Sequence, residues 1–314
     1  MLEVSAVALG GGHGLAASLS ALRRVVDEPT AVVTVADNGG SSGRLREEFD
    51  CLPPGDLRQA LAALCDDDVW GATWARVLQH RFASQGAMDK HAVGNLLIVA
   101  LWELLGDHVT GLEWVGRLLG AQGRVLPMAL APLDITARVR GADPERPDAD
   151  SVVRGQVEVA TTRGRVLEVR LDPLDPPACP QAVAAVKSAD WVVLGPGSWF
   201  TSVIPHLLVP DLRAALESTA ARTAVVLNLE AQPGETEGFA PETHLEVLSE
   251  HAPGLDVDVV LADRSSVRDV AALERVVSRW EARLVLADVA CTDGTSRHDT
   301  EKLALAYAEM MRES

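Results

Sequence analysis

The chain has 314 residues, 47% of them hydrophobic, and a formal net charge of −17. This length allows about two domains or one large α/β unit, while so acidic a chain is a poor candidate for sequence-independent binding to nucleic acid, which depends on neutralising phosphates. Widely spaced cysteines without a C-x-x-C pair, the absence of an N-terminal signal pattern and the shortness of the apolar stretches predict a cytoplasmic protein with no zinc site and no membrane insertion.

The N-terminal segment has the pattern strand, glycine turn, helix. An apolar run at residues 4–9 suits a buried strand, the residues GGGHG follow from Gly10, and a helical stretch covers 15–26. Such a turn directs the free amides of a helix N-terminus at a phosphate. The spacing is not the full dinucleotide fingerprint, because the third glycine comes too early for G-x-G-x-x-G. The candidate ligand contacts in this turn are Gly11, Gly12 and Gly14.

The segment from 34 to 61 is the most informative part of the chain. It follows a strand-like run at 31–35, and its positions 37–44 combine glycines with carboxylate, amide, hydroxyl and guanidinium groups. Glycine leaves no Cβ between a ligand and the backbone, so these positions are predicted to form a ligand-binding loop. A second polar cluster, at 53–58, opens the next helix. The candidate site residues of the two clusters are Asp37, Asn38, Gly39, Ser41, Arg44, Asp56 and Arg58.

The middle of the chain departs from the alternation of strands and helices. From about 66 to 119 no convincing strand occurs, and this segment is predicted to be helical. Within it, Asn95 lies on an apolar helix face and either caps locally or points into a site. Alternating apolar and polar residues then predict a small β-rich insertion at about 132–172, with an exposed turn at 141–150. The whole chain, 1–314, is predicted to form one domain.

Two more polar loops follow strand-like runs, at 195–202 and 228–238. Glycines in the first bring backbone amides close to a ligand, and amide side chains in the second offer donors and acceptors for a base or a sugar edge. In an open parallel sheet, ligands bind at the carboxyl ends of the strands, where these loops are expected to meet. The candidate contacts are Gly195, Gly197, Ser198, Thr201, Asn228, Gln232 and Thr236.

Continuous apolar runs determine the predicted fold class. They occur at 4–9, 31–35, 191–194, 223–228, 257–261 and 283–286, and such runs fit strands that are buried on both faces by helices. The sequence therefore predicts an α/β protein. Its expected architecture is a Rossmann-like three-layer sandwich with a mostly parallel sheet and the small β-rich insertion.

Six segments together resemble one family. They are GGGHG from Gly10, TVADNGGSSGRLR from Thr34, PPGDLRQAL from Pro53, VGNLLI from Val93, LGPGSWFTSVIPHLLV from Leu194 and QPGETEGF from Gln232. In this order they are similar to the YvcK-type gluconeogenesis-factor family, which belongs to the superfamily of the CofD 2-phospho-L-lactate transferases. The resemblance extends to about residue 266. Trp199-Phe200 stands where an aliphatic-Tyr pair is common, and His206 where Asn is common.

The resemblance implies a cytoplasmic protein that binds UDP-sugars, notably UDP-N-acetylglucosamine, and links carbon metabolism to peptidoglycan synthesis and cell shape. It implies no catalytic residue and no required cofactor, with unidentified cell-wall or regulatory proteins as partners and a homo-oligomer allowed. The transferase branch holds a divalent cation, such as Mg²⁺, on carboxylates at the places of Asp37 and Asp56. Its pattern of paired acids is otherwise absent, because Asn38-Gly39-Gly40 follows Asp37.

The predicted roles follow from this resemblance and from the loop positions. The N-terminal glycines approach the diphosphate from one side and the amides of the 195–198 loop from the other. Asp37 and Asn38 contact ribose or sugar hydroxyls, the polar groups of the 228–238 loop contact uracil or the remaining sugar, and Arg44 and Arg58 neutralise phosphate charge. Two alternatives stay open: a metal-dependent transferase acting on a deazaflavin acceptor, and an NAD-binding protein in which Asp37 contacts the ribose.

Overall fold

The structure is a computed structural model and describes residues 2–143, 145–146 and 148–312. Its centre is a seven-stranded sheet with the order β10-β9-β8-β7-β1-β2-β3, in which every pairing is parallel. The strands are β1 (Ala6–Gly10), β2 (Thr30–Val33), β3 (Arg124–Pro127), β7 (Trp191–Leu194), β8 (Arg222–Val226), β9 (Val259–Asp263) and β10 (Arg283–Ala287).

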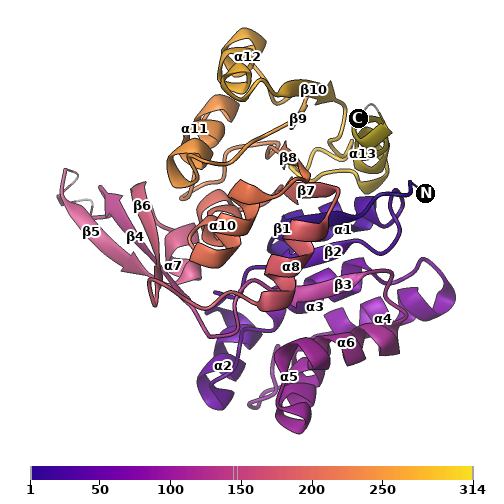
Figure 1. The fold of residues 1–314 in the computed structure, drawn as a ribbon. Helices are drawn as coiled ribbons and strands as arrows, with labels where there is room; N and C mark the ends of the chain where they lie inside the picture. The colour runs from indigo at the N-terminus through magenta and orange to yellow at the C-terminus, as the bar shows by residue number, and fades with distance from the viewer. Residues whose placement is uncertain (1, 144, 147, 313–314) are drawn as a thin grey trace.

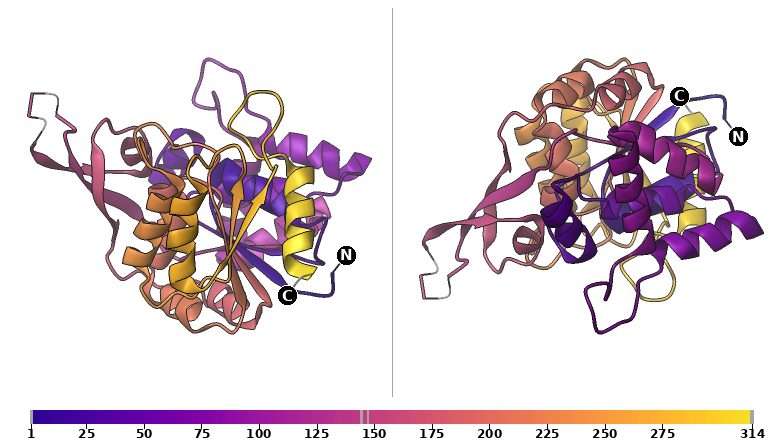
Figure 2. Two further views of the ribbon diagram at one scale, coloured as in Figure 1. Left: turned by 90° about the horizontal axis from the view of Figure 1, so that it is seen from above. Right: turned by 90° about the horizontal axis from the view of Figure 1, so that it is seen from below.

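Helices cover both faces of this sheet, so its central strands are apolar on both sides. All residues of β1, β7 and β9 are buried. Figures 1 and 2 show one group of helices on each side of the sheet. The first group contains α1 (Gly12–Leu22), α3 (Gly55–Ala63) and α13 (Thr300–Arg312), and the second contains α8 (Pro180–Ser188), α10 (Pro210–Ser218), α11 (Pro241–His251) and α12 (Val270–Val277). The predicted α/β class with a mostly parallel sheet is confirmed.

The sheet reverses its direction of winding between β1 and β7. From β1 the chain proceeds outward through β2 to β3, and from β7 it proceeds the other way through β8 and β9 to β10. β1 and β7 are direct neighbours, with Leu9 paired to Leu194. Their carboxyl ends therefore lie side by side, and the loops that leave them diverge to opposite faces of the sheet.

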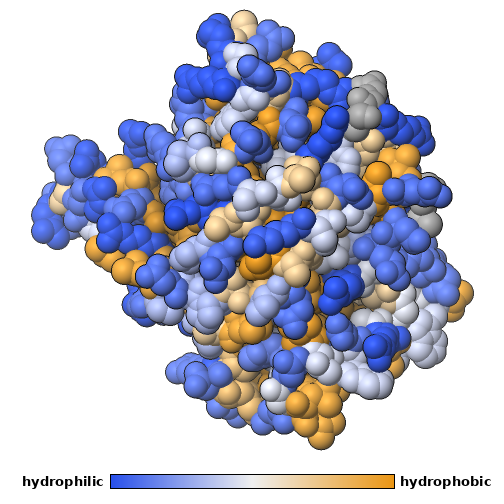
Figure 3. Space-filling model, viewed as in Figure 1, coloured by the Kyte–Doolittle hydropathy of each residue, from blue (hydrophilic) through white to orange (hydrophobic). Residues whose placement is uncertain are grey.

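Two additions surround this core. The helices α4 (Val69–Gln79), α5 (Val93–Leu105) and α6 (His108–Leu119) occupy the segment between α3 and β3. An arm projects from the body (Figure 1) and consists of the antiparallel strands β4 (Asp134–Arg140), β5 (Asp150–Arg154) and β6 (Arg165–Asp172), with α7 (Gln156–Ala160) between the last two. Ion pairs such as Arg138–Asp150 lie on its solvent face, and in Figure 3 the arm carries mainly hydrophilic residues.

The structure adds elements that the sequence did not predict. β3 lies at one edge of the sheet, and α2 (Gly40–Phe49) begins inside the predicted ligand loop. β5 begins at Asp150, where the sequence indicated the end of a turn; Pro144 and Pro147 of that turn lie outside the described residues. Three further helices are short: η1 (Trp199–Val203), α9 (Ile204–Leu207) and η2 (Ser278–Trp280). In the described ranges, no helix combines the length and apolar character needed to cross a membrane.

Candidate functional site

The N-terminus of α1 lies at the reversal point of the sheet and is built from glycines. Gly11 is the N-cap residue, so the N-cap position has no side chain that could cap the helix. Gly12 has a φ of +55°, and no other part of the described chain comes within 4 Å of the place where its Cβ would stand. A Cβ on Gly14 would lie 2.3 Å from the carbonyl oxygen of Pro196. Gly14 therefore lets α1 pack against the loop after β7, while Gly12 leaves open space beside the first helix amides.

Asn228 joins the loop after β8 to the loop after β7. Its Oδ1 accepts a hydrogen bond from the Gly197 amide (2.9 Å), and its Nδ2 donates to the Gly197 carbonyl oxygen (2.8 Å). Both ends of this side-chain amide are therefore occupied by backbone groups. The sequence predicted a contact between Asn228 and the ligand, whereas the observed bonds position Gly197.

The chain after Asn228 forms a turn that packs against the same loop. The backbone amide of Gln232 donates to Thr236 Oγ1 (2.9 Å), and its side-chain Nε2 donates to Ser198 Oγ (3.1 Å). Thr236 is fully buried, so its hydroxyl shapes the turn. Glu235 is 4% exposed, and burial raises the pKa of its carboxyl group.

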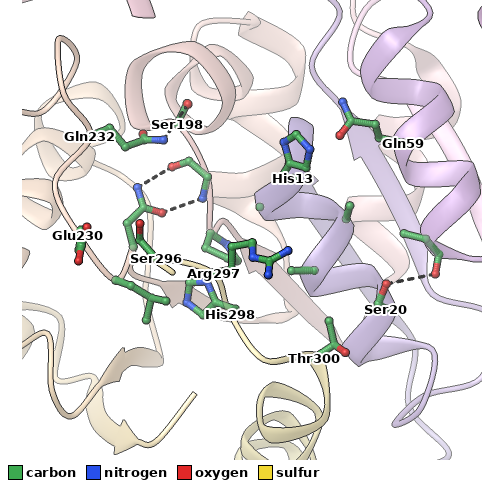
Figure 4. Close-up of a pocket in the computed structure, with 18 of the residues that line it drawn as sticks. His13, Ser20, Gln59, Ser198, Glu230, Gln232, Ser296, Arg297, His298 and Thr300 are labelled. Atoms are coloured by element: carbon green, nitrogen blue, oxygen red, sulfur yellow. Dashed lines mark hydrogen bonds between the residues drawn. The ribbon is translucent and has the colours of Figure 1, made fainter. Parts of the chain in front are cut away.

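These loops border a cavity of about 800 Å³ at the carboxyl ends of the strands (Figure 4). Helices α1, α3 and α4 contribute to one side, the loops after β7 and β8 form the opposite side, and the loop before α13 lies between them. Five residues predicted from the sequence line it: Gly14, Gly197, Ser198, Asn228 and Gln232. The cavity thus brings together loops that are far apart along the chain.

The sequence did not single out the loop at 291–299, which contributes basic groups to the cavity. In Figure 4, Arg297 lies between the side that carries Gln232 and the side formed by α1. Arg297 donates hydrogen bonds to Asp293 and Thr295 within its own loop. Burial lowers the pKa of His298 to about 4, so this imidazole is neutral at pH 7. No glycine cluster marks the loop, and only its place after β10 could have indicated it.

Asp37 and Asp56 lie close together beside the glycine turn. Asp37 Oδ1 accepts the Gly39 amide (2.8 Å), and Asp56, in the first turn of α3, accepts a hydrogen bond from the Gly12 amide. A Cβ on Gly11 would lie 2.7 Å from Asp56 Oδ2. Burial, reinforced by the charge of Asp37, raises the pKa of Asp56 to about 7. Next to the N-terminus of α1, the negative charge of Asp37 therefore disfavours ionisation of Asp56.

A buried polar network contains three of the predicted site residues. Arg58 is 3% exposed, and its Nε donates to Asn95 Oδ1 (2.8 Å). Asn95 Nδ2 donates in turn to Ser41 Oγ (3.0 Å). Asn95 thus joins this network and does not cap α5, whose N-cap residue is Ala92. Burial lowers the pKa of Arg58 to about 10, so it stays charged at pH 7, and it reaches the cavity through a hydrogen bond to Gln79.

Helix α7 of the arm holds the loops that follow three strands of the sheet. Asn38 Oδ1, after β2, accepts the amide of Val157 (3.1 Å). Gln156 Nε2 donates to the carbonyl oxygen of Thr201, after β7 (2.9 Å). The loop after β8 comes so close that a Cβ on Gly234 would lie 3.0 Å from the carbonyl oxygen of Ala160, the last residue of α7, and 2.7 Å from that of Thr162 just beyond it. The arm is therefore anchored to the rim of the cavity.

Most of the predicted site residues do not line this cavity. Arg44, for example, donates to the carbonyl oxygens of Ala87 and Asp89. Among the residues described, no three His, Cys, Asp or Glu side chains are grouped so that they could hold a metal ion. The predicted residues outside the lining are Gly11, Gly12, Asp37, Asn38, Gly39, Ser41, Arg44, Asp56, Arg58, Asn95, Gly195, Thr201 and Thr236.

Known proteins resemble this chain in sequence and in fold. The model of the family described as 2-phospho-L-lactate transferase CofD matches residues 6–296. A putative gluconeogenesis factor of Mycobacterium tuberculosis is 56% identical over 301 residues, which cover 95% of this chain and 87% of the relative. A gluconeogenesis factor of Listeria innocua is 33% identical, with 97% and 95% covered.

The structural comparison agrees with the sequence comparison. The crystal structure of a UPF0052-family protein from Bacillus halodurans superposes with a TM-score of 0.86 at 29% identity, and the match covers 98% of this chain and 99% of that one. The resemblance found in the sequence motifs is therefore confirmed. The chain belongs to the CofD family, and within it to the group of the gluconeogenesis factors.

Proposed function

We propose that the cavity binds a nucleotide sugar of the UDP-N-acetylglucosamine type. The observation that supports this most directly is its position at the reversal point between β1 and β7. Open α/β sheets bind nucleotides at this point, outside the carboxyl ends of the strands. The glycine-containing loop after β7 and the first turn of α1, which follows β1, both contribute to the lining, so the ligand would lie between them.

The α1 side of the cavity suits the diphosphate of such a ligand. Helix α1 is 11 residues long; its Gly12 amide is bonded to Asp56, but His13 and Gly14 of the first turn line the cavity, where their amides and the positive end of the helix dipole favour an anion. Gly197 and Ser198 line the opposite side and offer a backbone amide and a hydroxyl. Arg297 supplies positive charge in the lining, a role that the sequence assigned to Arg44 and Arg58.

The proposed role is that of a cytoplasmic regulator and not of an enzyme. Membership in the gluconeogenesis-factor group supports a protein that responds to a UDP-sugar and links carbon metabolism to peptidoglycan synthesis and cell shape through protein partners. The four cysteines are free, which suits a reducing compartment.

A metal-dependent transferase is a second candidate function, and the Asp37–Asp56 pair favours it. Mg²⁺ is commonly bound through one or two protein carboxylates, with substrate phosphates and waters as the other ligands. Asp37 and Asp56 fit this requirement and would hold the ion, which would neutralise charge on substrate phosphates. The pKa of Asp56, raised to about 7, fits a pair of carboxylates that needs a cation before both are charged.

Calorimetric titration with UDP, UDP-N-acetylglucosamine, UDP-glucose, NAD and GDP tests the proposal. We expect the UDP-sugars to bind and NAD neither to bind nor to displace them. Absence of binding by every uridine compound at millimolar concentration would overturn the proposal, and tighter binding of NAD would favour an NAD-binding protein. Magnesium-dependent turnover of a diphosphate donor with a deazaflavin acceptor would assign the protein to the transferase branch.

A further inference from the structure

Strand β5 is an open edge of the arm. The sheet of the arm has the order β5-β4-β6, and within the described ranges no strand pairs with the outer side of β5. Figure 1 shows β5 at the outer margin of the arm, and both views of Figure 2 show the arm extending away from the body. An open edge presents backbone groups to which a further strand can bond.

The register between β4 and β5 shows which backbone groups of β5 are open. Beyond the end of β5, the amide of Gly155 donates to the carbonyl oxygen of Ile135 (2.8 Å). Hydrogen-bonded and non-hydrogen-bonded pairs alternate along an antiparallel ladder. Every second residue counted back from Gly155 therefore bonds to β4, and the residues between them, Asp150, Val152 and Arg154, direct their N–H and C=O groups outward.

The side chains of the same three residues lie in a row on one face of the arm, because alternate residues of a strand project from the same face. The row places a carboxylate at one end and a guanidinium group at the other. Val152 lies between them and is 76% exposed. An apolar β-branched side chain on an open edge, with an acid on one side and a base on the other, is suited to a strand that carries the same groups in the opposite order.

A second copy of β5, running antiparallel, carries them in that order. With a two-fold axis at Val152, Asp150 of each copy lies opposite Arg154 of the other, and Val152 lies opposite itself. Opposite charges and β-branched residues are favourable cross-strand pairs, and the paired residues are those whose backbone groups point outward. Any other register in which these groups meet breaks both charge pairs, so the charges also select the register.

The charged side chains are already held in place on their own chain. Two arginines of β4 bind Asp150, and two aspartates, one from β4 and one from β6, bind Arg154. Pairing with a second copy therefore costs less conformational entropy than the pairing of free side chains would. The net charge of −17 makes two copies repel each other, but contact at the projecting arms keeps the acidic bodies apart, and salt screens charges beyond about 8–10 Å.

We propose that the protein forms a dimer in which β5 pairs antiparallel with β5 of a second copy, about a two-fold axis at Val152. The two arms then form one continuous sheet with three strands from each copy. Such an interface is isologous, because each copy contributes the same surface. Five residues from each copy make a small interface, so the dimer is reversible and depends on concentration. This inference does not depend on which ligand the cavity binds.

Reversing the charges one at a time provides the test, with sedimentation equilibrium of the full chain as the measurement. In Asp150→Arg or Arg154→Asp alone, two opposite-charge pairs across the axis become two like-charge pairs. We expect each variant to dimerise about tenfold or more weakly than the wild-type protein. An equimolar mixture of the two variants should form a heterodimer with nearly the wild-type affinity, because each changed residue then faces its opposite charge.

The mixture also serves as the control for folding, since an arm that a substitution had disrupted would not recover its partner on mixing. Val152→Pro gives a second measurement. It removes an outward N–H and leaves the bonds to β4 intact, so dimerisation should be lost while the far-UV circular dichroism stays native. Val152→Thr keeps the N–H and the β-branched shape and should dimerise.

Four results would overturn the inference. The first is a wild-type protein that stays monomeric up to millimolar concentration, which would leave the edge to an extended segment of another protein. The others are undiminished dimerisation of either single charge variant, undiminished dimerisation of Val152→Pro, and a mixture of natively folded charge variants that stays monomeric.

Discussion

Asp56 is a residue whose surroundings make the stability of the protein depend on pH. Burial, together with the neighbouring Asp37, raises its pKa from 3.8 to about 7. The folded state therefore binds this proton more tightly than the unfolded state does. The resulting stabilisation is complete below about pH 4 and is lost as the pH rises through 7.

Replacing Asp56 by Asn removes this dependence while keeping the shape of the side chain. We expect the melting temperature of Asp56→Asn, relative to that of the wild-type protein, to increase between pH 5 and pH 8. Thermal unfolding followed by circular dichroism at several pH values measures this difference. A difference that stays constant over the range would show that the proton of Asp56 does not contribute.

The role of Asp37 differs between the two candidate functions, a ligand-binding regulator and a metal-dependent transferase. Its Oδ1 accepts the Gly39 amide, so the carboxylate has a role in its own loop that needs no metal. For a regulator, we expect UDP-N-acetylglucosamine binding by the wild-type protein to be insensitive to EDTA, and Asp37→Asn to bind with nearly the wild-type affinity, because this residue lies outside the cavity lining and Asn can still accept the Gly39 amide. Calorimetry with and without EDTA decides the matter. Binding that is lost in EDTA and restored by magnesium would instead identify the Asp37–Asp56 pair as a cation site.

At the scale of elements, the N-terminus of α1 allows the phosphate contact to be tested separately from backbone strain. Gly12 and Gly106 both have positive φ, +55° and +67°, and neither has another part of the described chain within 4 Å of its Cβ position. Valine at either position costs a similar strain, on the order of 1–3 kcal/mol. Gly12, however, precedes His13 and Gly14 of the cavity lining in the first turn of α1, whereas Gly106 is the C-cap residue of α5 and has no neighbour in that lining.

We therefore expect Gly12→Val to lose most of its affinity for UDP-N-acetylglucosamine and Gly106→Val to keep it, while both are destabilised to a similar extent. Calorimetry and chemical denaturation provide the two measurements. Equal affinity in the two variants would mean that the turn after β1 serves only to connect the strand to its helix.

The sequence predicts most of the sheet because long apolar runs are typical of strands buried on both faces. β3 is different: only Val125 and Leu126 separate Arg124 from Pro127, and so short a run cannot be told from a loop. Helix α2 begins with Gly-Ser-Ser-Gly, residues with poor helix propensity, and tertiary contacts determine its start. A Cβ on Gly43 would lie 2.1 Å from the carbonyl oxygen of Asn38, an approach that no local pattern reveals.

The sequence predicts which loops form the candidate site but not which of their side chains are available to a ligand. Glycine-rich and polar segments after strands correctly indicate the edge of the sheet at which the cavity lies. They do not show which side chains are already engaged within the protein. Asn228 is used to hold Gly197, and Arg58 is buried in a network, because the partners of both come from distant parts of the chain.

At the scale of the whole molecule, the cavity connects the two halves of the sheet. Its lining includes α1 and α3 from the half that leads to β3, and the loops after β7 and β8 from the other half. A ligand bound there contacts both halves, so unfolding of either one must release it. Ligand binding therefore stabilises the entire chain and not a single loop.

We expect UDP-N-acetylglucosamine at a hundred times its dissociation constant to add about 2.7 kcal/mol to the free energy of unfolding. The whole unfolding transition should move upward by several degrees as one step. Thermal unfolding at increasing ligand concentration measures the shift, with NAD as the comparison. A transition that splits in two, or one that NAD raises equally, would contradict this expectation.

Because α7 is anchored to the loops at the cavity, movement of the arm is coupled to movement of those loops. Asn38, Thr201 and the loop at Gly234 are all held by this one short helix, while the parallel sheet beneath them is built from other residues. One end of the arm is therefore attached to the loops at the rim of the cavity, and its other end projects into solvent. A partner that moves the projecting end of the arm would shift these loops, and so change ligand binding, without disturbing the sheet. Conversely, a ligand that draws the loops together would change the orientation of the arm.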